Sequence, residues 1–194
     1  MENNVIAVIL AGGKSSRMGS PKGLLDLKGK TWIEHQIDKL EFATEIYIGI
    51  GYHSTAYLEL EPKLGKKVQL LINPQPDKGP FSTLKHVLHN IKLPSSSSLL
   101  VCPVDIPISS QVSLLLEFDG SVIRPTYRGK SGHPILLRKQ AIDTCKKADY
   151  SGRLDEVLMS CQKTEVPFED ALIHSNLNTP EEWAIFKEKY LSLY

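Results

Sequence analysis

A short, uninterrupted apolar run near the N-terminus constrains the fold more than any other feature of the sequence. Val5–Leu10 contains six consecutive apolar residues and leads directly into Ala11-Gly12-Gly13. A strand that is buried on both faces of a parallel sheet has this pattern, whereas a half-exposed strand alternates apolar with polar residues. Similar short runs recur at Glu45–Ile50, Val68–Ile72, Leu99–Val101 and Ser121–Ile123.

The segments between these runs have the spacing of helices. Thr31-Trp-Ile-Glu34 is a capping-box pattern that predicts a helix from there to about Leu40. Pro80–Ile91 carries apolar residues at helical spacing. Strands that alternate with helices in this way imply right-handed crossovers, so we expect a three-layer α/β/α fold around a mostly parallel, Rossmann-like sheet.

The last third of the chain is less regular but still alternates between the two kinds of element. Thr179-Pro-Glu-Glu182 predicts a helix start that continues to about Tyr190, with threonine as the cap and proline in the first turn. The other expected elements are a surface loop at Ser95–Ser98, strands at Pro134–Leu137 and Lys163–Pro167, and helices at Lys139–Lys147 and Arg153–Ser160. A length of 194 residues suits a single domain over residues 1–194.

Composition excludes several classes of function. The net charge is only +1, with acidic and basic residues mixed, so no broad nucleic-acid surface is expected. No segment reaches the roughly 18 apolar residues of a membrane span. Cys102, Cys145 and Cys161 are widely spaced and form no CxxC pair, which favours a reducing compartment. We expect a cytoplasmic protein, a monomer or weak dimer, that binds neither nucleic acid nor membrane.

The loop after the first strand is the strongest functional signal. Ligands of open α/β sheets bind beyond the carboxyl ends of the strands, where this loop begins. We expect Gly12 and Gly13 to permit positive φ and to let a ligand approach the backbone. Successive amides in such a turn bind anions, and Lys14, Arg17 and Lys22 add positive charge. An ordinary glycine turn with surface cations is the alternative interpretation.

Two familiar phosphate motifs do not fit this loop. A Walker A loop that ended at Gly13-Lys14-Ser15 would need its first glycine at Val8, inside the strand. The G-x-G-x-x-G dinucleotide pattern fails because Lys14 stands in place of a glycine. The sequence therefore disfavours both a P-loop NTPase and a Rossmann dehydrogenase.

The loop does resemble one known family. The pattern Leu-Ala-Gly-Gly-x-x-x-Arg-Met-Gly-x-x-Lys, from Leu10 to Lys22, resembles the signature of the MobA-like nucleotidyltransferases, which attach GMP or CMP to molybdopterin. The resemblance extends over nearly the whole chain. It implies a Mg²⁺-dependent enzyme that moves a nucleoside monophosphate from an NTP to a phosphorylated acceptor. The residues that it implies for nucleotide binding in this loop are Leu10, Ala11, Gly12, Gly13, Arg17 and Lys22, the last two also catalytic.

A second segment, Asn73–Thr83, resembles the part of the family that borders the nucleotide base. Gly79 lets the backbone approach a ring, and Ser82 supplies a hydroxyl. The resemblance implies nucleotide contacts from Asn73, Gly79 and Ser82. The alternative is an ordinary loop followed by a helix start.

The expected metal site combines two distant segments. Asp105 follows the apolar strand at Leu99–Val101 and resembles the metal-binding aspartate of the family, although an aspartate after a strand is also a common cap. Asn178 matches a position that is aspartate in some relatives, and an amide is the weaker ligand. Because Mg²⁺ uses one or two carboxylates plus substrate phosphates, this sparse pair suits it.

Two further segments resemble the acceptor side of the family's site. Gly129–Ile135 contains Gly-His-Pro, and His133 there is expected to contact the acceptor. Asn176, in the Asn-x-Asn-Thr-Pro-Glu segment, is expected to do the same. Either side chain could instead hold its own loop together.

The donor and acceptor are predicted from the same resemblance. Gly-His-Pro and Gly-Pro-Phe-Ser fit the cytidylyltransferase branch, so CTP and molybdopterin are expected. GTP, a sugar- or alditol-phosphate acceptor, and a non-catalytic nucleotide-binding regulatory module stay open as alternatives. Arg17, Lys22 and Asp105 are the three expected catalytic residues, and together they favour an enzyme. An acceptor phosphate with a second pKa near 6 is already largely dianionic at pH 7, so no general base is required.

Overall fold

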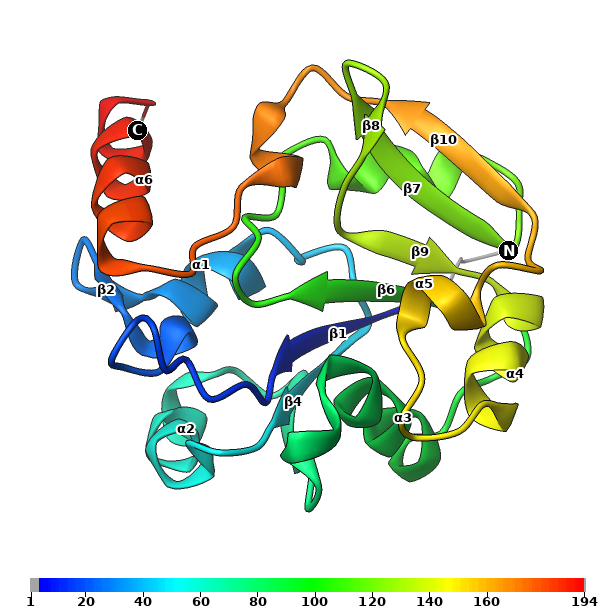
Figure 1. Cartoon of the computed structure of the whole chain (residues 1–194), viewed down its shortest axis with the longest axis horizontal. Coiled ribbons are helices and arrows are strands. Elements are labelled where there is room, and N and C mark those ends of the chain that lie inside the picture. Colours follow the sequence, from blue (N-terminus) through cyan, green and yellow to red (C-terminus); the bar gives the residue numbers. More distant parts are fainter. Residues whose placement is uncertain (1–3, 194) are drawn as a thin grey trace.

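A central mixed sheet organises the computed structural model, which describes residues 4–193. The strands follow the order β10-β7-β9-β6-β1-β4-β5 (Figure 1). β9 is antiparallel to both of its neighbours, β6 and β7, whereas the other strands on this path run in one direction. The strands of this path are β1 (Val5–Ala11), β4 (Glu45–Ile50), β5 (Val68–Ile72), β6 (Ser98–Pro103), β7 (Val122–Tyr127), β9 (Ile135–Leu137) and β10 (Lys163–Pro167).

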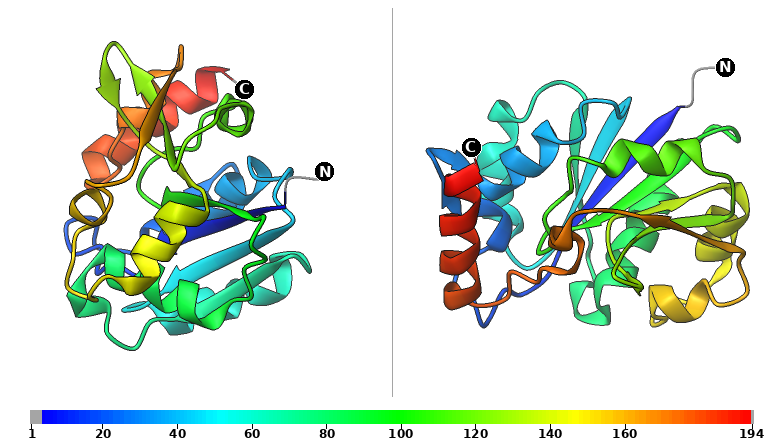
Figure 2. Two further views of the ribbon diagram at one scale, coloured as in Figure 1. Left: turned by 90° about the vertical axis from the view of Figure 1, so that its right-hand side faces the viewer. Right: turned by 90° about the horizontal axis from the view of Figure 1, so that it is seen from above.

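Helices cover both faces of this sheet. Ile6 and Val8 of β1 face one apolar core and Ala7 and Ile9 face the other, and all four are fully buried. The first core contains α3 (Pro80–Asn90) and α4 (Lys139–Lys147). The second contains α1 (Trp32–Asp38), α2 (Ser54–Leu60) and α6 (Pro180–Leu193). The three-layer α/β/α prediction is confirmed, and Figure 2 shows α6 and α4 at opposite ends of the molecule.

Short elements complete the fold. β2 (Asp26–Leu27) and β3 (Lys30–Thr31) form a small hairpin, β8 (Lys130–Ser131) pairs with β7, and α5 spans Leu154–Val157. The 3-10 turns are η1 (Lys22–Leu24), η2 (Glu61–Lys63), η3 (Pro76–Lys78), η4 (Val112–Glu117) and η5 (Ala171–His174).

Both predicted helix starts are confirmed by their hydrogen bonds. The Thr31 amide and hydroxyl donate to Glu34 Oε2 at 2.8 and 2.6 Å. At the start of α6, the Thr179 amide donates to Glu182 Oε2 at 3.0 Å, and the Glu182 amide donates to Thr179 Oγ1 at 3.3 Å.

Three sequence predictions need correction. The expected helix at Arg153–Ser160 shrinks to α5, because the chain after it tightens into turns in which Met159 bonds back to Glu156 and Cys161 to Leu158. The strand expected at Ser121–Ile123 starts one residue later and continues to Tyr127. The Ser95–Ser98 segment is only partly a surface loop, since Ser98 opens β6 and is fully buried.

Thr83 of α3 fits into a gap that two glycines leave. A Cβ on Gly12 would lie 2.7 Å from Thr83 Oγ1, and a Cβ on Gly49 would overlap Thr83 Cγ2. The Thr83 hydroxyl also accepts a 3.0 Å hydrogen bond from Asn73 Nδ2. This contact therefore sets how closely α3 approaches the glycine loop after β1.

We predict that Gly49→Ala lowers the free energy of unfolding by about 1–3 kcal/mol, because the added methyl group overpacks a filled core. Adding Thr83→Ser should recover part of the loss, since serine keeps the hydroxyl and removes Cγ2. Chemical denaturation measures both, with Gly13→Ala as the control because a Cβ there meets nothing within 4 Å. Equal losses in Gly49→Ala and Gly13→Ala would contradict this packing argument.

Candidate active site

A cleft of about 810 Å³ opens beyond the carboxyl ends of β1 and β6. Ala11, the last residue of β1, and Pro103, the last residue of β6, both line it. The predicted site residues that line this cleft are Leu10, Ala11, Gly12, Gly13, Lys22, Gly79, Asp105 and His133. The structure thus brings together most of the residues that the sequence singled out from four separate segments.

A cation contact between three distant segments lies at the edge of this cleft. The Lys22 ammonium donates to Asp105 Oδ2 at 3.1 Å and to Asn178 Oδ1 at 2.5 Å. The Lys22 side chain is only 12% exposed and that of Asp105 29%. The two predicted metal ligands therefore face each other across a positive charge, and Lys22 is directed at them rather than into the glycine loop.

The backbone beside Lys22 is held by a buried tyrosine. The Gly23 amide donates to Tyr57 Oη at 3.1 Å, and a Cβ on Gly23 would lie 2.5 Å from that oxygen. Burial raises the pKa of Tyr57 to about 12, so the phenol stays protonated at neutral pH. Lys22 is consequently fixed from the side of α2.

Two side chains of α1 fix the loop that carries Asp105. Trp32 Nε1 donates to the Val104 carbonyl at 2.8 Å. Gln36 is fully buried and bonds twice, donating to the Ile106 carbonyl at 2.9 Å and accepting from the Ile108 amide at 2.9 Å. The oxygen and the nitrogen of the Gln36 side-chain amide therefore both help to position the loop that carries Asp105. This role of Gln36 was not predicted from the sequence.

The start of α6 fixes Asn178. Glu182 Oε2 accepts the Asn178 amide at 2.7 Å, and the Leu177 amide donates to the Asp105 carbonyl at 2.8 Å. The rings of Trp183 and Phe186 pack on Trp32 of α1 at centroid distances of 5.7 and 5.1 Å. Trp32 therefore supports both halves of the cation contact.

The glycine loop differs from the expectation in its backbone. Neither Gly12 nor Gly13 has positive φ; the residues of this loop that do are Ser15 and Gly19. Gly12 is instead required by its contact with Thr83. The prediction of positive φ at these two glycines was wrong, because close packing rather than turn geometry excludes a side chain at Gly12.

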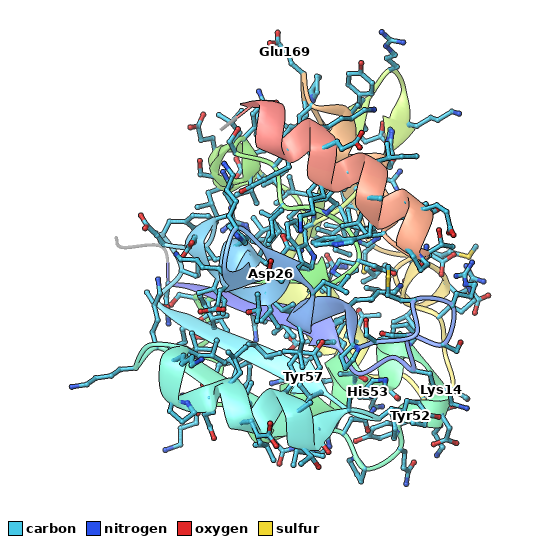
Figure 3. The ribbon with its side chains drawn as sticks, turned by 90° about the vertical axis from the view of Figure 1, so that its left-hand side faces the viewer. Lys14, Asp26, Tyr52, His53, Tyr57 and Glu169 are labelled. Carbon is cyan, nitrogen blue, oxygen red and sulfur yellow. The ribbon has the colours of Figure 1, made fainter. Side chains whose placement is uncertain are left out.

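The cations of the glycine loop have separate environments. Figure 3 shows Lys14, Tyr52 and His53 side by side. The Lys14 ammonium lies 4.8 Å from the centre of the Tyr52 ring, and the Lys14 backbone carbonyl lies 2.8 Å from His53 Nε2. Arg17 is exposed and does not line the cleft. Its contact with a polyphosphate stays a prediction.

Asn73 and Ser82 lie beneath the cleft instead of lining it. Asn73 Nδ2 donates to Ser82 Oγ at 2.9 Å, and both side chains are buried. Ser82 Oγ lies 2.7 Å from the Gly79 carbonyl, and Gly79 has a φ of +87° that favours glycine. These two polar side chains position Gly79. Of the three residues predicted in this segment, Gly79 is the one that lines the cleft.

His133 lines the cleft and lies near Asp105. Burial lowers the pKa of His133, and the nearby Asp105 charge opposes this shift, so the ring is neutral at neutral pH. Its Nδ1 atom is occluded and has no hydrogen-bond partner among the described residues. Gly132 lets this segment approach η5, because a Cβ there would lie 2.5 Å from the Ile173 carbonyl. Asn176 is exposed and lies outside the lining.

Several cations that line the cleft were not predicted from the sequence. Lys78, Arg124, Arg153 and Lys163 all line it. Arg124 lies in β7 and Lys163 begins β10. The apolar residues of these strands indicated only a core, and neither cation belongs to a recognisable motif. Among residues 4–193, no three His, Cys, Asp or Glu side chains gather into a metal site, and no helix is long and apolar enough to cross a membrane.

The cleft at the carboxyl edge of the sheet is typical of nucleotide-binding α/β proteins. The family model of the MobA-like NTP transferase domain matches residues 7–165. The chain belongs to this family of MobA-like NTP transferases. Its members are enzymes that transfer nucleotides, and the resemblance seen in the sequence is confirmed.

Named relatives agree with this family. The probable molybdenum cofactor guanylyltransferase of Rhodopirellula baltica is 35% identical over 112 residues, which cover 57% of this chain and 53% of that protein, about half its length. The molybdenum cofactor cytidylyltransferase of Escherichia coli is 24% identical over 193 residues, 96% of this chain and 97% of that one. A solved nucleotidyl transferase from Methanothermobacter thermautotroptrophicus shares the fold, with 22% identity, coverage of 99% and 100%, and a TM-score of 0.77.

We predict that Gln36→Leu weakens Mn²⁺ binding at Asp105 as well as stability. Leucine keeps the volume but removes both bonds to the Val104–Ile108 loop, leaving buried backbone groups unpaired at about 1–3 kcal/mol. Thermal unfolding and Mn²⁺ titration by electron paramagnetic resonance measure the two effects. Gln111→Leu is the control, because Gln111 bonds the Glu169 amide away from the cleft. An unchanged Mn²⁺ affinity in Gln36→Leu would show that this side chain does not position Asp105.

Proposed function

We propose that this protein transfers CMP from CTP to the terminal phosphate of molybdopterin and releases pyrophosphate. The observation that carries the proposal is the contact of Lys22 with Asp105 and Asn178 beside the glycine loop. It provides a cation site where the phosphates of a nucleotide in the cleft would lie. Membership of the MobA-like family supports nucleotide transfer, and the choice of base and acceptor is our own inference.

The donor side of the site supplies backbone amides and one lysine. The loop from Gly12 onward offers amide donors at the carboxyl end of β1, where a polyphosphate is favourably bound. Lys22 adds a charge that can follow the β- and γ-phosphates as pyrophosphate leaves. Positioning and electrostatic stabilisation of this kind supply most of the catalysis in phosphoryl-type transfers.

The residues around Lys22 fit a magnesium ion. Asp105 and Asn178 present a carboxylate and an amide oxygen, which are the hard donors that Mg²⁺ prefers, and they already hold a positive charge between them. Bound there with substrate phosphates, Mg²⁺ would neutralise phosphate charge and polarise the bond that breaks. Asp105 and Asn178 would hold the ion, and Lys22 would be free to contact phosphate oxygens instead.

The acceptor side needs no general base. A phosphate monoester is largely dianionic at pH 7 and is itself the nucleophile. His133 is neutral there and can hydrogen-bond the acceptor without adding or removing a full charge. The arrangement therefore orients two anions toward each other, which is the principal difficulty of the reaction.

The proposed choice of CTP has two supports. Gly132 and His133 line the cleft and belong to the Gly-His-Pro segment that resembles the cytidylyl branch, and the E. coli cytidylyltransferase is similar along almost its whole length. Ser82, which also suggested this branch, does not reach the cleft and gives no support. The molybdenum cofactor guanylyltransferase of Yersinia pestis is similar over the same length, with 28% identity over 97% of this chain and 98% of that one, so GTP is the competing donor in the experiment.

We predict that pyrophosphate release requires both CTP and molybdopterin and is at least about tenfold slower with GTP, ATP or UTP at equal concentration. A base-selective pocket discriminates through hydrogen bonds whose loss costs 1.4 kcal/mol or more, which is about tenfold in rate. Release is followed with a coupled pyrophosphate assay. Faster release with GTP would assign the guanylyl reaction, and binding of CTP without release in the presence of any acceptor would favour a regulatory module.

We predict opposite effects on metal binding for two neighbouring variants. Asp105→Asn removes the carboxylate and should weaken Mn²⁺ binding in the absence of nucleotide. Lys22→Met removes the competing ammonium and should strengthen it. Both variants should lower kcat by about 10²-fold or more, because each removes a charge that stabilises the transition state. Electron paramagnetic resonance of Mn²⁺ separates the two variants, and weaker Mn²⁺ binding in both would exclude a shared position for the ammonium and the metal.

A further inference from the structure

The segment between β4 and α2 supports the glycine loop from outside the cleft. A Cβ on Gly51 would lie 2.6 Å from the carbonyl oxygen of Gly12, so the two backbones are in direct contact. The Tyr52 amide donates to the same carbonyl at 3.5 Å. Neither Tyr52 nor His53 lines the cleft. Their contacts with the loop therefore act on its backbone and not on a ligand.

His53 holds one peptide unit of the loop. Its Nε2 atom lies 2.8 Å from the carbonyl oxygen of Lys14. A carbonyl oxygen only accepts hydrogen bonds, so Nε2 carries the proton and donates. The carbonyl and the N–H of a trans peptide point in opposite directions. The bond to the Lys14 carbonyl therefore directs the N–H of Ser15 away from His53.

The preceding peptide unit is oriented in the same way. Because the Tyr52 amide holds the Gly12 carbonyl, the N–H of Gly13 is directed away from Tyr52. Gly13 and Ser15 both line the cleft, and neither amide has a hydrogen-bond partner among residues 4–193. Two amides of the loop are thus directed at the cleft and free to bind an anion there.

The side chain between these two amides points the other way. Lys14 does not line the cleft, and its ammonium lies 4.8 Å from the centre of the Tyr52 ring. Figure 3 shows Lys14 beside Tyr52 and His53. The outward direction of this side chain agrees with the inward direction inferred for the amides of Gly13 and Ser15.

The same helix also holds the far end of the loop. The Tyr57 amide donates to the His53 carbonyl at 3.3 Å, so the two residues are one helical turn apart and their side chains share a face. Tyr57 Oη accepts the Gly23 amide at 3.1 Å. One turn of α2 therefore fixes the loop near its beginning, at Lys14, and at its end, at Gly23.

We propose that His53 is a positioning residue for the nucleotide. Without touching the ligand, it directs the Ser15 amide, with the Gly13 amide beside it, at the polyphosphate chain. Loss of the His53 bond frees the Lys14–Ser15 peptide to rotate, so that a charge-assisted hydrogen bond to a phosphate oxygen is lost. The inference rests on the proposed function and adds to it a residue outside the cleft on which phosphate binding depends.

Inorganic triphosphate, a polyphosphate without a base, tests this role by isothermal titration calorimetry in the presence of Mg²⁺. His53→Leu should weaken its binding at least about tenfold, because one oriented donor to a charged group is lost. His53→Gln should restore most of the affinity, since a glutamine amide N–H can donate to the same carbonyl. His174→Leu is the matched control, because His174 Nε2 lies 2.8 Å from the Lys130 carbonyl and His174 does not line the cleft. It should bind triphosphate like the wild type.

Two further measurements separate positioning from a general loss of structure. The amide resonance of Ser15 should shift on addition of triphosphate in the wild-type protein and much less in His53→Leu. In pyrophosphate release, His53→Leu should raise the KM for the nucleotide at least about tenfold and leave the KM for the acceptor unchanged.

The inference and the proposed function can fail separately. If triphosphate binding depends on His53 but no nucleotide and acceptor give pyrophosphate, the proposed function fails and the role of His53 stands. If the wild-type protein does not bind triphosphate, or if His53→Leu binds it as the wild type or His174→Leu does, the inference is overturned.

Discussion

The burial of β1 on both faces is the constraint on which the rest of the molecule depends. Because Ile6 and Val8 face one core and Ala7 and Ile9 the other, helices must cover both sides of the sheet. Strands parallel to β1 then end at one common edge, and the crossing helices leave that edge open. The cleft lies there, so the position of the site follows from the same pattern that makes the strand apolar.

The site is assembled from chain segments that are far apart in sequence. Lys22, Asp105 and Asn178 meet only because α1 holds the loop after β6 and the start of α6 packs on α1. Trp32 takes part in both contacts, through its indole N–H and through its rings. A rigid buried scaffold of this kind keeps the charged groups of the site in place.

The ammonium of Lys22 gives the site an internal cation. Asp105 is partly buried, and without a partner its charge would be costly there. Lys22 supplies that partner while no other cation is bound. In the proposed function, a metal ion and the phosphates of its nucleotide would offer new partners to Asp105 and to Lys22 at once, so the two ligands are expected to bind more tightly together than separately. Such coupling is reciprocal between the two ligands.

The sequence alone determined where the strands of the main sheet path lie, the two capped helices and the glycine loop, because strand burial at Val5–Leu10 and caps at Thr31 and Thr179 are local in sequence. It also indicated Asp105, through a strand that must end at the ligand-binding edge. Only the tertiary structure decided that Gly12 is required by packing, that Ser82 turns away from the cleft, and that Gln36, Arg124 and Lys163 belong to the site. The last three could not be predicted, because their roles depend on strand pairing and helix packing between segments that have no regular spacing along the chain.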